Sequence, residues 1–417
     1  MKKVLIIAYY WGTRIPGLVK YLPEFGWQPV ILTAPLIEKP DAQFRVVETS
    51  YRDVLSFWKR LFRLNPDEDV RRQVKKRFGV TSKNSLVDFI LTCVGEVVNY
   101  PDGDKGWKPF AVKAGDELLQ QENIDAIISS SSPVTSHLIA KELKAKYKIP
   151  WVADFRDLWS QNHNYSYSPI RKLFDRRLEL KTLSTADALV TVSQPWADKL
   201  STLHKGKVTY AITNGFDPDT VNIPPAGLTT KFTITYTGLV HQRHDASKFF
   251  AALQESISEE IMNPNEVEVR FYGSAMEWLD REIEQYRLSN IVKQYGRVPV
   301  QVAREKQRES QLLLQLSWEG REKAGYSGKL FEYLAAQRPI LATGLGNDMT
   351  EELLDETRAG LYSSTVEEIK SILNELYSEY KNMGEVIYKG DEAKINRYSY
   401  RETANKFTDI LDHLTQK

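Results

Sequence analysis

The chain has 417 residues, more than one hydrophobic core usually organises, so we expect two domains. Its apolar fraction of 42% and charged fraction of 27% are typical of soluble globular proteins and exclude a largely disordered chain. No segment has the length of a membrane span, and a single cysteine, Cys93, excludes an internal disulfide and a cysteine-based metal cage. We therefore expect a cytoplasmic protein.

Charge is unevenly distributed along the chain. The net charge is +1, but residues 1–215 contain 32 Lys and Arg against 23 Asp and Glu, a net charge of +9. The remaining residues contain 24 against 32, a net charge of −8. A basic half favours an anionic partner, either a membrane surface at the inner face of the membrane or a phosphorylated acceptor. Scattered solvated lysines are the alternative explanation.

The apolar run at residues 4–8 predicts a first strand buried on both faces of a parallel sheet. It is too short for a secretion signal and has no cleavage site. The loop at residues 10–16 carries Gly12 and Arg14 and leads into a helix, and residues 29–33 form the second strand. This loop lacks the G-x-G-x-x-G spacing, yet open α/β sheets bind ligands at the carboxyl end of a first strand.

Residues 36–120 are harder to assign. Residues 51–64 form a basic amphipathic helix with aromatics, which suits either a membrane interface or packing on the sheet. An apolar helix follows at about residues 86–98. Asp102 and Asp104 have the spacing of a metal-binding pair, but the adjacent proline and glycine predict a plain turn.

Regular alternation resumes with strands at residues 124–130 and 150–153 and a helix at 135–146 between them. His137 lies one turn into that helix, where a structural role and direct ligand contact both remain open. Charged and aromatic side chains follow the second of these strands: Asp154, Arg156, Asp157 and Trp159. We interpret them as too polar for a core and as placed where chemistry would occur. A salt-bridged helix start is the alternative.

Strands at residues 188–192 and 207–212 complete the first half, and a turn followed by Pro224 and Pro225 indicates a connection. We therefore predict an amino-terminal domain over residues 1–215 and a linker over 216–230. A carboxyl-terminal domain follows over 231–393. Residues 394–417 contain a last amphipathic helix that could cross back to the first domain.

The β/α pattern restarts in the second half, with strands at residues 232–237, 267–272, 291–295, 312–317 and 340–343. Glycines such as Gly238 follow these strands directly and allow a ligand to approach the backbone. The next loop contains His241, Arg243 and His244. Arg243 could bind a diphosphate, whereas two histidines without further ligands do not make a metal site.

Residues 325–343 predict a turn, a short helix and a strand, with Pro339 ending the helix at about Arg338. Ser327 is a good cap residue, and the first helical amides lie at Gly328 and Lys329. Free amides and the positive end of the helix dipole can hold a phosphate, and Lys329 adds a charge. Glu332, one turn later, could accept hydrogen bonds from ribose hydroxyls. An amphipathic helix with a Lys–Glu pair is the alternative.

The fold class is therefore α/β, with two doubly wound Rossmann-like domains that present loops to a shared cleft. Four segments narrow the choice among nucleotide enzymes with this plan: residues 154–159, 190–193, 214–217 and 329–339. Together they resemble the family 4 retaining glycosyltransferases of GT-B fold, particularly bacterial members that build surface polysaccharides. The resemblance covers most of the chain and is weakest over residues 36–120.

The resemblance implies a hexosyltransferase that moves a sugar from a nucleotide-diphosphate sugar, with retention, to a saccharide or lipid-linked acceptor. The donor would bind the carboxyl-terminal domain and the acceptor the amino-terminal one. No metal or other cofactor and no nucleic acid is expected. Candidates for the acceptor or sugar side are Gly12, Arg14, His137 and Trp159.

Glu332 resembles the ribose-binding second glutamate of the family's E-x7-E motif. The first glutamate, which normally contacts the donor sugar, is replaced by Ala324. Sugar recognition must therefore differ, with Glu319, Glu322 and Lys323 as candidates.

Other donor contacts also follow from the resemblance. Ser327 and Gly328 lie where backbone amides meet the sugar and diphosphate, and Arg243 matches the usual diphosphate-binding arginine. The second basic residue is either Lys248 or Lys329.

Arg156 and Asp157 lie where many members place a catalytic-site histidine, which leaves Asp157 or Asp154 as the polar group nearest the reacting carbon. We favour front-face departure assisted by the phosphate over a covalent glycosyl-aspartate. The missing first glutamate motivates one alternative, a non-enzymatic nucleotide-sugar-binding or inactive partner protein. A nucleotide-sugar epimerase or hydrolase on the same two-domain plan is the other alternative.

Overall fold

The structure is a computed structural model that describes residues 1–36, 44–53, 65, 73, 86–162, 165, 167–221, 227–241, 244–316, 325–345 and 349–416. The chain divides into two compact units. Unit 1 comprises Met1–Ile212 and Ala404–Lys417, and unit 2 comprises Thr213–Thr403. Within the described ranges, no helix is both long enough and apolar enough to cross a membrane.

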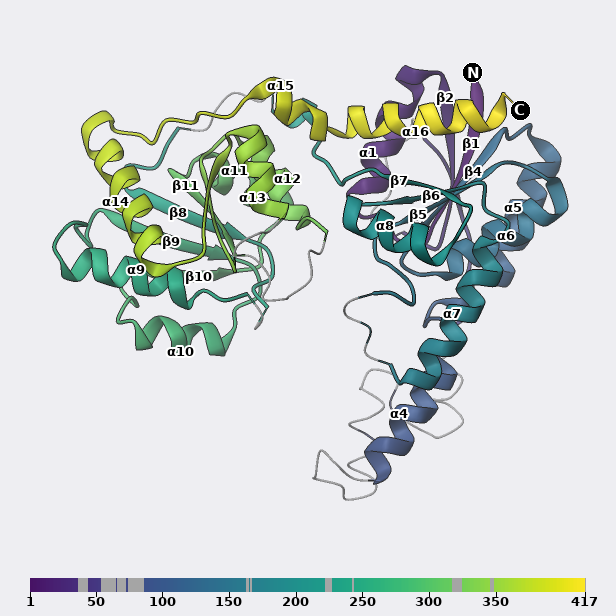
Figure 1. Cartoon of the computed structure of the whole chain (residues 1–417), viewed down its shortest axis with the longest axis horizontal. Helices are drawn as coiled ribbons and strands as arrows, with labels where there is room; N and C mark the ends of the chain where they lie inside the picture. The colour runs from purple at the N-terminus through teal and green to yellow at the C-terminus, as the bar shows by residue number, and fades with distance from the viewer. Residues whose placement is uncertain are drawn as a thin grey trace. The chain divides into compact units, whose positions relative to one another are not determined.

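Unit 1 is built on a parallel sheet of seven strands (Figure 1). The chain runs outward from β1 through β2 to β3 at one edge and then returns to the other side of β1, so the direction switches between β1 and β4. Strands β1 and β2 are almost continuous apolar runs, as expected for strands covered on both faces. In spatial order the strands are β3 (Arg45–Glu48), β2 (Trp27–Thr33), β1 (Lys2–Ala8), β4 (Ala126–Ser131), β5 (Trp151–Phe155), β6 (Ala188–Thr191) and β7 (Val208–Ala211).

The last helix of the chain belongs largely to unit 1, although it follows unit 2 in sequence. Asp412 on this helix accepts hydrogen bonds from Lys2 Nζ at 2.8 Å and from Trp27 Nε1 at 3.1 Å. These contacts attach the carboxyl terminus to the edge where β1 and β2 begin. The helices of unit 1 are α1 (Arg14–Tyr21), α4 (Leu86–Val98), α5 (Lys108–Gln121), α6 (Thr135–Tyr147), α7 (Pro169–Leu183), α8 (Gln194–Leu203) and α16 (Tyr400–Thr415).

Unit 2 contains a parallel sheet of six strands, and its direction switches between β8 and β11. Ligands of open α/β sheets bind beside such a switch, at the carboxyl ends of the strands. In spatial order the strands are β10 (Val292–Gly296), β9 (Val267–Tyr272), β8 (Phe232–Thr237), β11 (Leu312–Leu316), β12 (Ile340–Thr343) and β13 (Gly360–Ser363). The helices are α9 (Ser247–Ser258), α10 (Glu277–Gln285), α11 (Val300–Arg308), α12 (Gly328–Ala336), α13 (Met349–Thr357), α14 (Val366–Met383) and α15 (Glu392–Ile395).

Two apolar clusters cover the faces of the second sheet. Side chains of α9, α10 and α14 form the larger one, and those of α12 and α13 form the smaller one. β11 shows how one strand serves both: Leu312 and Leu314 belong to the first cluster and Leu313 to the second. This alternation fixes α12 against the strand that precedes it.

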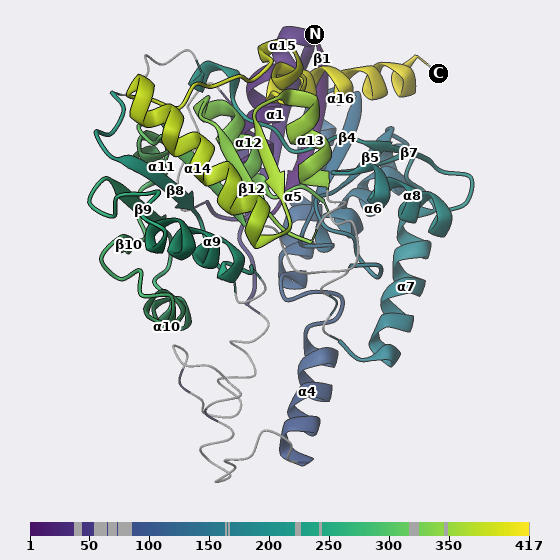
Figure 2. The same cartoon turned by 60° about the vertical axis from the view of Figure 1, so that its left-hand side comes forward.

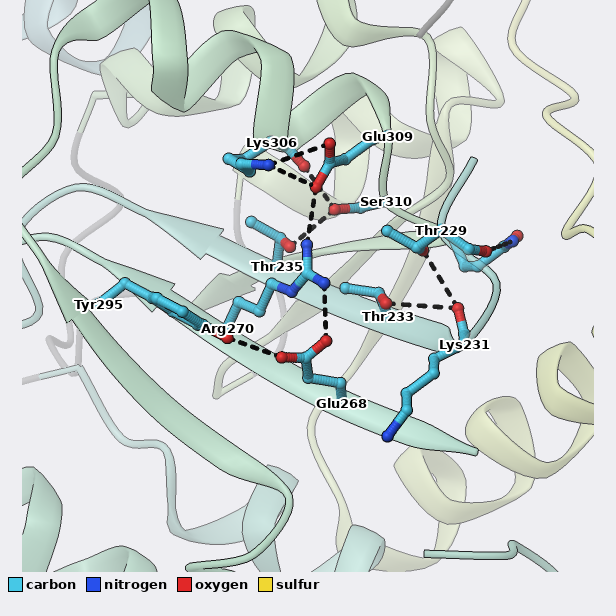
Figure 3. Close-up of polar contacts among 11 residues, drawn as sticks. Thr229, Lys231, Thr233, Thr235, Glu268, Arg270, Tyr295, Lys306, Glu309 and Ser310 are labelled. Atoms are coloured by element: carbon cyan, nitrogen blue, oxygen red, sulfur yellow. Dashed lines mark hydrogen bonds and ion pairs between the residues drawn. The ribbon is translucent and has the colours of Figure 1, made fainter. Parts of the chain in front are cut away.

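The carboxyl-terminal end of α11 is held by polar contacts instead (Figure 3). Arg270 on β9 donates to Glu268 Oε2 and to Glu309 Oε1, both at 2.7 Å, and Lys306 also pairs with Glu309. Ser310 donates to Thr235 Oγ1 at 2.7 Å. These contacts fix the position of α11, whose side chains reach the candidate site described below.

The pattern of apolar runs predicted most of the strands, and β8, β9 and β12 have the predicted bounds. The apolar helix predicted at residues 86–98 is α4. Two edge strands, β3 and β13, were not predicted because neither contains a run of buried apolar residues. Most of the basic helix expected at residues 51–64 lies outside the described residues.

Candidate functional site

The amino terminus of α12 follows β11, beside the switch point of the second sheet. Ser327 is the N-cap residue, with φ −64° and ψ 132°, but its hydroxyl accepts no hydrogen bond from the helix. The first amides of α12 therefore are not capped by this side chain, in contrast to the usual role of serine here. The helix ends at Ala336, two residues before the expected end, since Gln337 adopts a left-handed conformation.

Lys329 folds over the end of β8. Its Nζ lies 4.0 Å from the centroid of the Tyr236 ring and donates a hydrogen bond to the Tyr236 hydroxyl, which in turn donates to the Leu239 carbonyl at 3.0 Å. Gly238 has φ +103°, and a Cβ there would lie 3.4 Å from Lys329 Cε. Burial lowers the pKa of Lys329 to about 7, although Glu332 opposes the shift. The site thus holds a cation that a bound anion would stabilise.

Glu332 lies one turn after Lys329 and is also half-buried. Burial raises the pKa of Glu332, while Arg304, a hydrogen bond from Gln307 and Lys329 counteract the increase. Gln307 Nε2 also donates to Thr237 Oγ1 at 2.8 Å. A shielded carboxylate held in this way can accept hydrogen bonds from neighbouring hydroxyls of a ligand.

The loop after β8 brings His244 toward Lys329. Burial is the main cause that lowers the pKa of His244 to about 4, and Lys329 and His241 add to it. His244 Nδ1 accepts a hydrogen bond from the His241 amide at 3.0 Å. Lys248, the other candidate for the second basic residue, donates to the Ser364 carbonyl at 2.8 Å. Arg243 lies outside the described residues.

A polar hollow of about 560 Å³ adjoins His244 and extends the candidate site toward α10. This volume is typical of small-molecule sites. Its other lining residues are Asp245, Ser247, Trp278, Arg281, Glu282 and Gln285. Among the described residues, no group of His, Cys, Asp and Glu side chains could hold a metal ion.

In unit 1, Asp154 and Arg14 form a buried ion pair. Asp154 lies within β5, 0% exposed, and Arg14 is 1% exposed. Arg14 Nε and Nη2 donate to the two carboxylate oxygens at 3.2 and 2.9 Å, and Ser130 Oγ donates to the same carboxylate at 2.9 Å. The expectation that Asp154 is too polar for a core is therefore wrong, because a distant arginine compensates its charge. Neither side chain is accessible to a ligand at the surface.

The residues just after β5 differ in accessibility. Asp157 is exposed and Arg156 is half-buried, whereas Trp159 is only 5% exposed. A Cβ on Gly12, which has φ +46°, would lie 2.9 Å from Arg156 Nη1. Gly12, which follows β1, and Arg156, which follows β5, therefore lie side by side at the carboxyl-terminal edge of the sheet. Trp159 is buried and is not available for contact with a ligand.

His137 is a core residue. It is 0% exposed, its Nδ1 lies 2.7 Å from Ser129 Oγ, and its ring centroid is 4.4 Å from that of Phe155. Burial lowers its pKa to about 3, so the ring is neutral at physiological pH. The assignment of His137 to a ligand contact is therefore wrong, and the structural role left open by the sequence is correct.

The turn at residues 102–104 has a local structural role. Asp102 accepts hydrogen bonds from the amide and the hydroxyl of Thr135, the first residue of α6, at 2.7 and 2.8 Å. This carboxylate caps α6 and occupies the position that an anionic ligand would need.

Several residues of the candidate site were not recognised from the sequence. Tyr236, Thr237, Arg304 and Gln307 come from β8 and α11, and Tyr333 on α12 accepts a hydrogen bond from the Thr237 amide at 2.9 Å. The only sequence signal near these residues is the predicted end of a strand at Gly238, where a ligand can approach the backbone. The candidates for sugar recognition, Glu319, Glu322 and Lys323, lie outside the described residues, as does Ala324 at the position of the missing glutamate.

Comparisons with known proteins show what parts of the chain are similar to. Residues 81–220 match the family model described as Glycosyltransferase Family 4. Over these residues, about a third of the chain, the protein is similar to family 4 glycosyltransferases. No curated protein matches this chain in sequence.

Solved structures show that this chain has the GT-B fold. A glycosyltransferase from Rickettsia africae is 13% identical, with 100% of this chain and 99% of that chain covered and a TM-score of 0.63. HepE from Anabaena, solved in complex with UDP, is 13% identical, with 99% and 100% covered and a TM-score of 0.63. Sucrose-phosphate synthase from Thermosynechococcus elongatus is 12% identical, with full coverage of both chains and a TM-score of 0.60.

Proposed function

We propose that this protein is a glycosyltransferase that transfers a hexose from a nucleotide-diphosphate sugar to a saccharide or lipid-linked acceptor, with retention, in surface polysaccharide biosynthesis. The observation that carries the donor assignment is the arrangement of Lys329 and Glu332 on α12 beside Gly238. Of the structural neighbours, HepE has been solved with UDP and glucose. The proposal places the nucleotide at the carboxyl ends of β8 and β11, where the direction of the sheet switches.

The chemistry requires stabilisation of the leaving nucleoside diphosphate. Negative charge develops on it as the glycosidic bond breaks, and preorganised donors at that position lower the barrier. In the proposal these donors are Lys329 and the first amides of α12, including that of Gly328. Glu332 accepts hydrogen bonds from the ribose, and Arg243 adds a second positive charge.

The acceptor side is assigned to unit 1. Asp157 is the exposed carboxylate next to Arg156 and Gly12, so we propose that it lies nearest the reacting carbon. Asp154 and Arg14 act from the core by holding β5 and α1 in place. Departure of the diphosphate from the face that the acceptor attacks preserves the anomeric configuration without a covalent intermediate.

The proposal requires no metal ion, since Lys329 and the helix amides supply the positive charge that the diphosphate needs. Activity that is lost in EDTA and restored by a divalent cation would contradict this part.

The decisive experiment combines nucleotide binding with product analysis. We expect UDP or GDP to raise the melting temperature of the protein, because a ligand that binds only the folded state stabilises it. Incubation of nucleotide-sugars with saccharide and lipid-linked acceptors should release the nucleotide and yield a product of retained configuration. Nucleotide binding without any release would favour a non-enzymatic binding protein. Conversion of the donor without acceptor would indicate an epimerase or hydrolase.

A further inference from the structure

Two helices of unit 1 expose an unusual amount of apolar surface. Seven of the eighteen exposed large apolar side chains in the described part of the chain lie on α4, on α7 or just before α7. Their exposed fractions range from 38% to 75%, and the other eleven are scattered over many elements. Such a concentration marks an interaction surface. The seven are Val94, Val97, Tyr167, Ile170, Leu173, Phe174 and Leu180.

The carboxyl-terminal end of α4 is fixed to the amino-terminal end of α7. Glu96 accepts hydrogen bonds from the amide and the hydroxyl of Ser168 at 2.7 and 2.5 Å. Arg171 Nη2 donates to the Asn99 and Pro101 carbonyls at 3.2 and 2.7 Å. Figures 1 and 2 show both helices projecting beyond the sheet of unit 1. The apolar side chains are therefore presented on one supported structure, which we name the α4–α7 face.

On α7 most of the positively charged side chains are exposed, whereas the negatively charged ones are buried. Its exposed ionisable residues are all cations, namely Lys172, Arg176, Arg177 and Lys181. Its two carboxylates point inward: Asp175, 1% exposed, pairs with Arg171 Nε at 2.9 Å, and Glu179, 0% exposed, accepts from the Ser160 amide at 3.0 Å. The outer side of α7 thus combines apolar and cationic side chains without an exposed acidic one.

We propose that the α4–α7 face docks on an anionic lipid surface. Apolar side chains at positions 170, 173 and 174 share one side of α7 and can enter the boundary between head groups and acyl chains. Lysine and arginine have long apolar stems, so the cations can reach lipid phosphates from the same side.

Other occupants fit the α4–α7 face less well. A second copy would bring like charges together, which disfavours self-association. Nucleic acid phosphates would pair with the cations, but nucleic acid would not cover the exposed aliphatic side chains. The proposal concerns unit 1 alone and does not rest on the donor assignment, so lipid binding is tested without nucleotide.

The test is co-sedimentation of the full-length protein with vesicles of phosphatidylcholine, with or without phosphatidylglycerol. Leu173→Asp/Phe174→Asp removes apolar contacts, and Arg176→Glu/Arg177→Glu reverses two charges. Ile261→Asp/Val300→Asp is the matched control, since both side chains are exposed and lie in unit 2. Circular dichroism and thermal unfolding establish that each variant is folded.

We expect the wild type to bind vesicles that contain phosphatidylglycerol and to be released by salt. The charge reversal should lower the partition coefficient by about 25-fold or more, because each cation near an anionic surface contributes about fivefold. The apolar variant should also lose binding, and the control should retain it.

Three outcomes would overturn the proposal. The first is a wild type that does not bind anionic vesicles, and the second is folded α7 variants that bind as well as the wild type. The third is a wild-type dimer in analytical ultracentrifugation that the α7 variants dissociate, which would assign the face to a second copy.

Discussion

Replacement of Lys329 by methionine should stabilise the empty protein and weaken nucleotide binding. Methionine keeps an unbranched side chain of similar length, so the packing on Tyr236 is largely retained while the charge is removed. In the wild type that charge lies in a half-buried position 4.0 Å from the Tyr236 ring centroid, where water is partly excluded. The residue therefore costs stability in the absence of an anion and regains it when the diphosphate binds.

The magnitude follows from the pKa of Lys329. Burial lowers it from 10.5 to about 7, and the whole shift would correspond to about 5 kcal/mol. The side chain is half-buried and gains a cation–π contact, so we expect Lys329→Met to raise the unfolding free energy at pH 7 by about 2 kcal/mol. The pKa is lower in the folded state, so the unfolded chain binds more protons between about pH 7 and 10.5. Wild-type stability should therefore rise with pH across this window, and the variant should lack that rise.

Urea unfolding at several pH values measures the stability, and calorimetry measures the affinity for UDP or GDP. The dissociation constant should increase about 10- to 100-fold, as expected for loss of a hydrogen bond to a charged group. Lys381→Met is the matched control, because Lys381 pairs with Glu266 at 2.8 Å outside the site. That change should lower stability slightly and leave nucleotide affinity unaltered. A Lys329→Met protein that is less stable than the wild type at pH 7, or that binds nucleotide equally well, would refute the reasoning.

Three further predictions concern neighbouring and distant contacts. Glu332→Gln keeps the shape of the side chain but removes one acceptor for the ribose, so the dissociation constant for UDP or GDP should rise about tenfold in calorimetry; no change would remove Glu332 from the site. Gly238→Ala places a methyl group where φ is +103° and where Lys329 Cε lies 3.4 Å away, so both melting temperature and nucleotide affinity should fall. Asp154→Asn leaves Arg14 buried without a counter-charge and should lower the unfolding free energy by about 3–5 kcal/mol in urea titrations, which a loss below about 1 kcal/mol would contradict.

The sequence by itself determined the α/β class and the order of most elements. Strand positions follow from local apolar runs, so residues 232–237 and 340–343 could be assigned without knowledge of their neighbours. The turn before Gly328 and the proline after the helix likewise predicted α12 and its amino terminus. The edge strands β3 and β13 were not predicted because neither contains a run of buried apolar residues.

Only the tertiary structure decided which polar residues belong to a site. Asp154 and Asp157 look equivalent in sequence, but Arg14, 140 residues away, makes the first a buried structural residue, whereas the second stays exposed. Conversely, nothing in the sequence marks Tyr236 of β8, yet its hydroxyl accepts a hydrogen bond from Lys329, 93 residues away. Local propensity depends on neighbours along the chain, while burial and pKa depend on neighbours in space, which a single sequence does not contain.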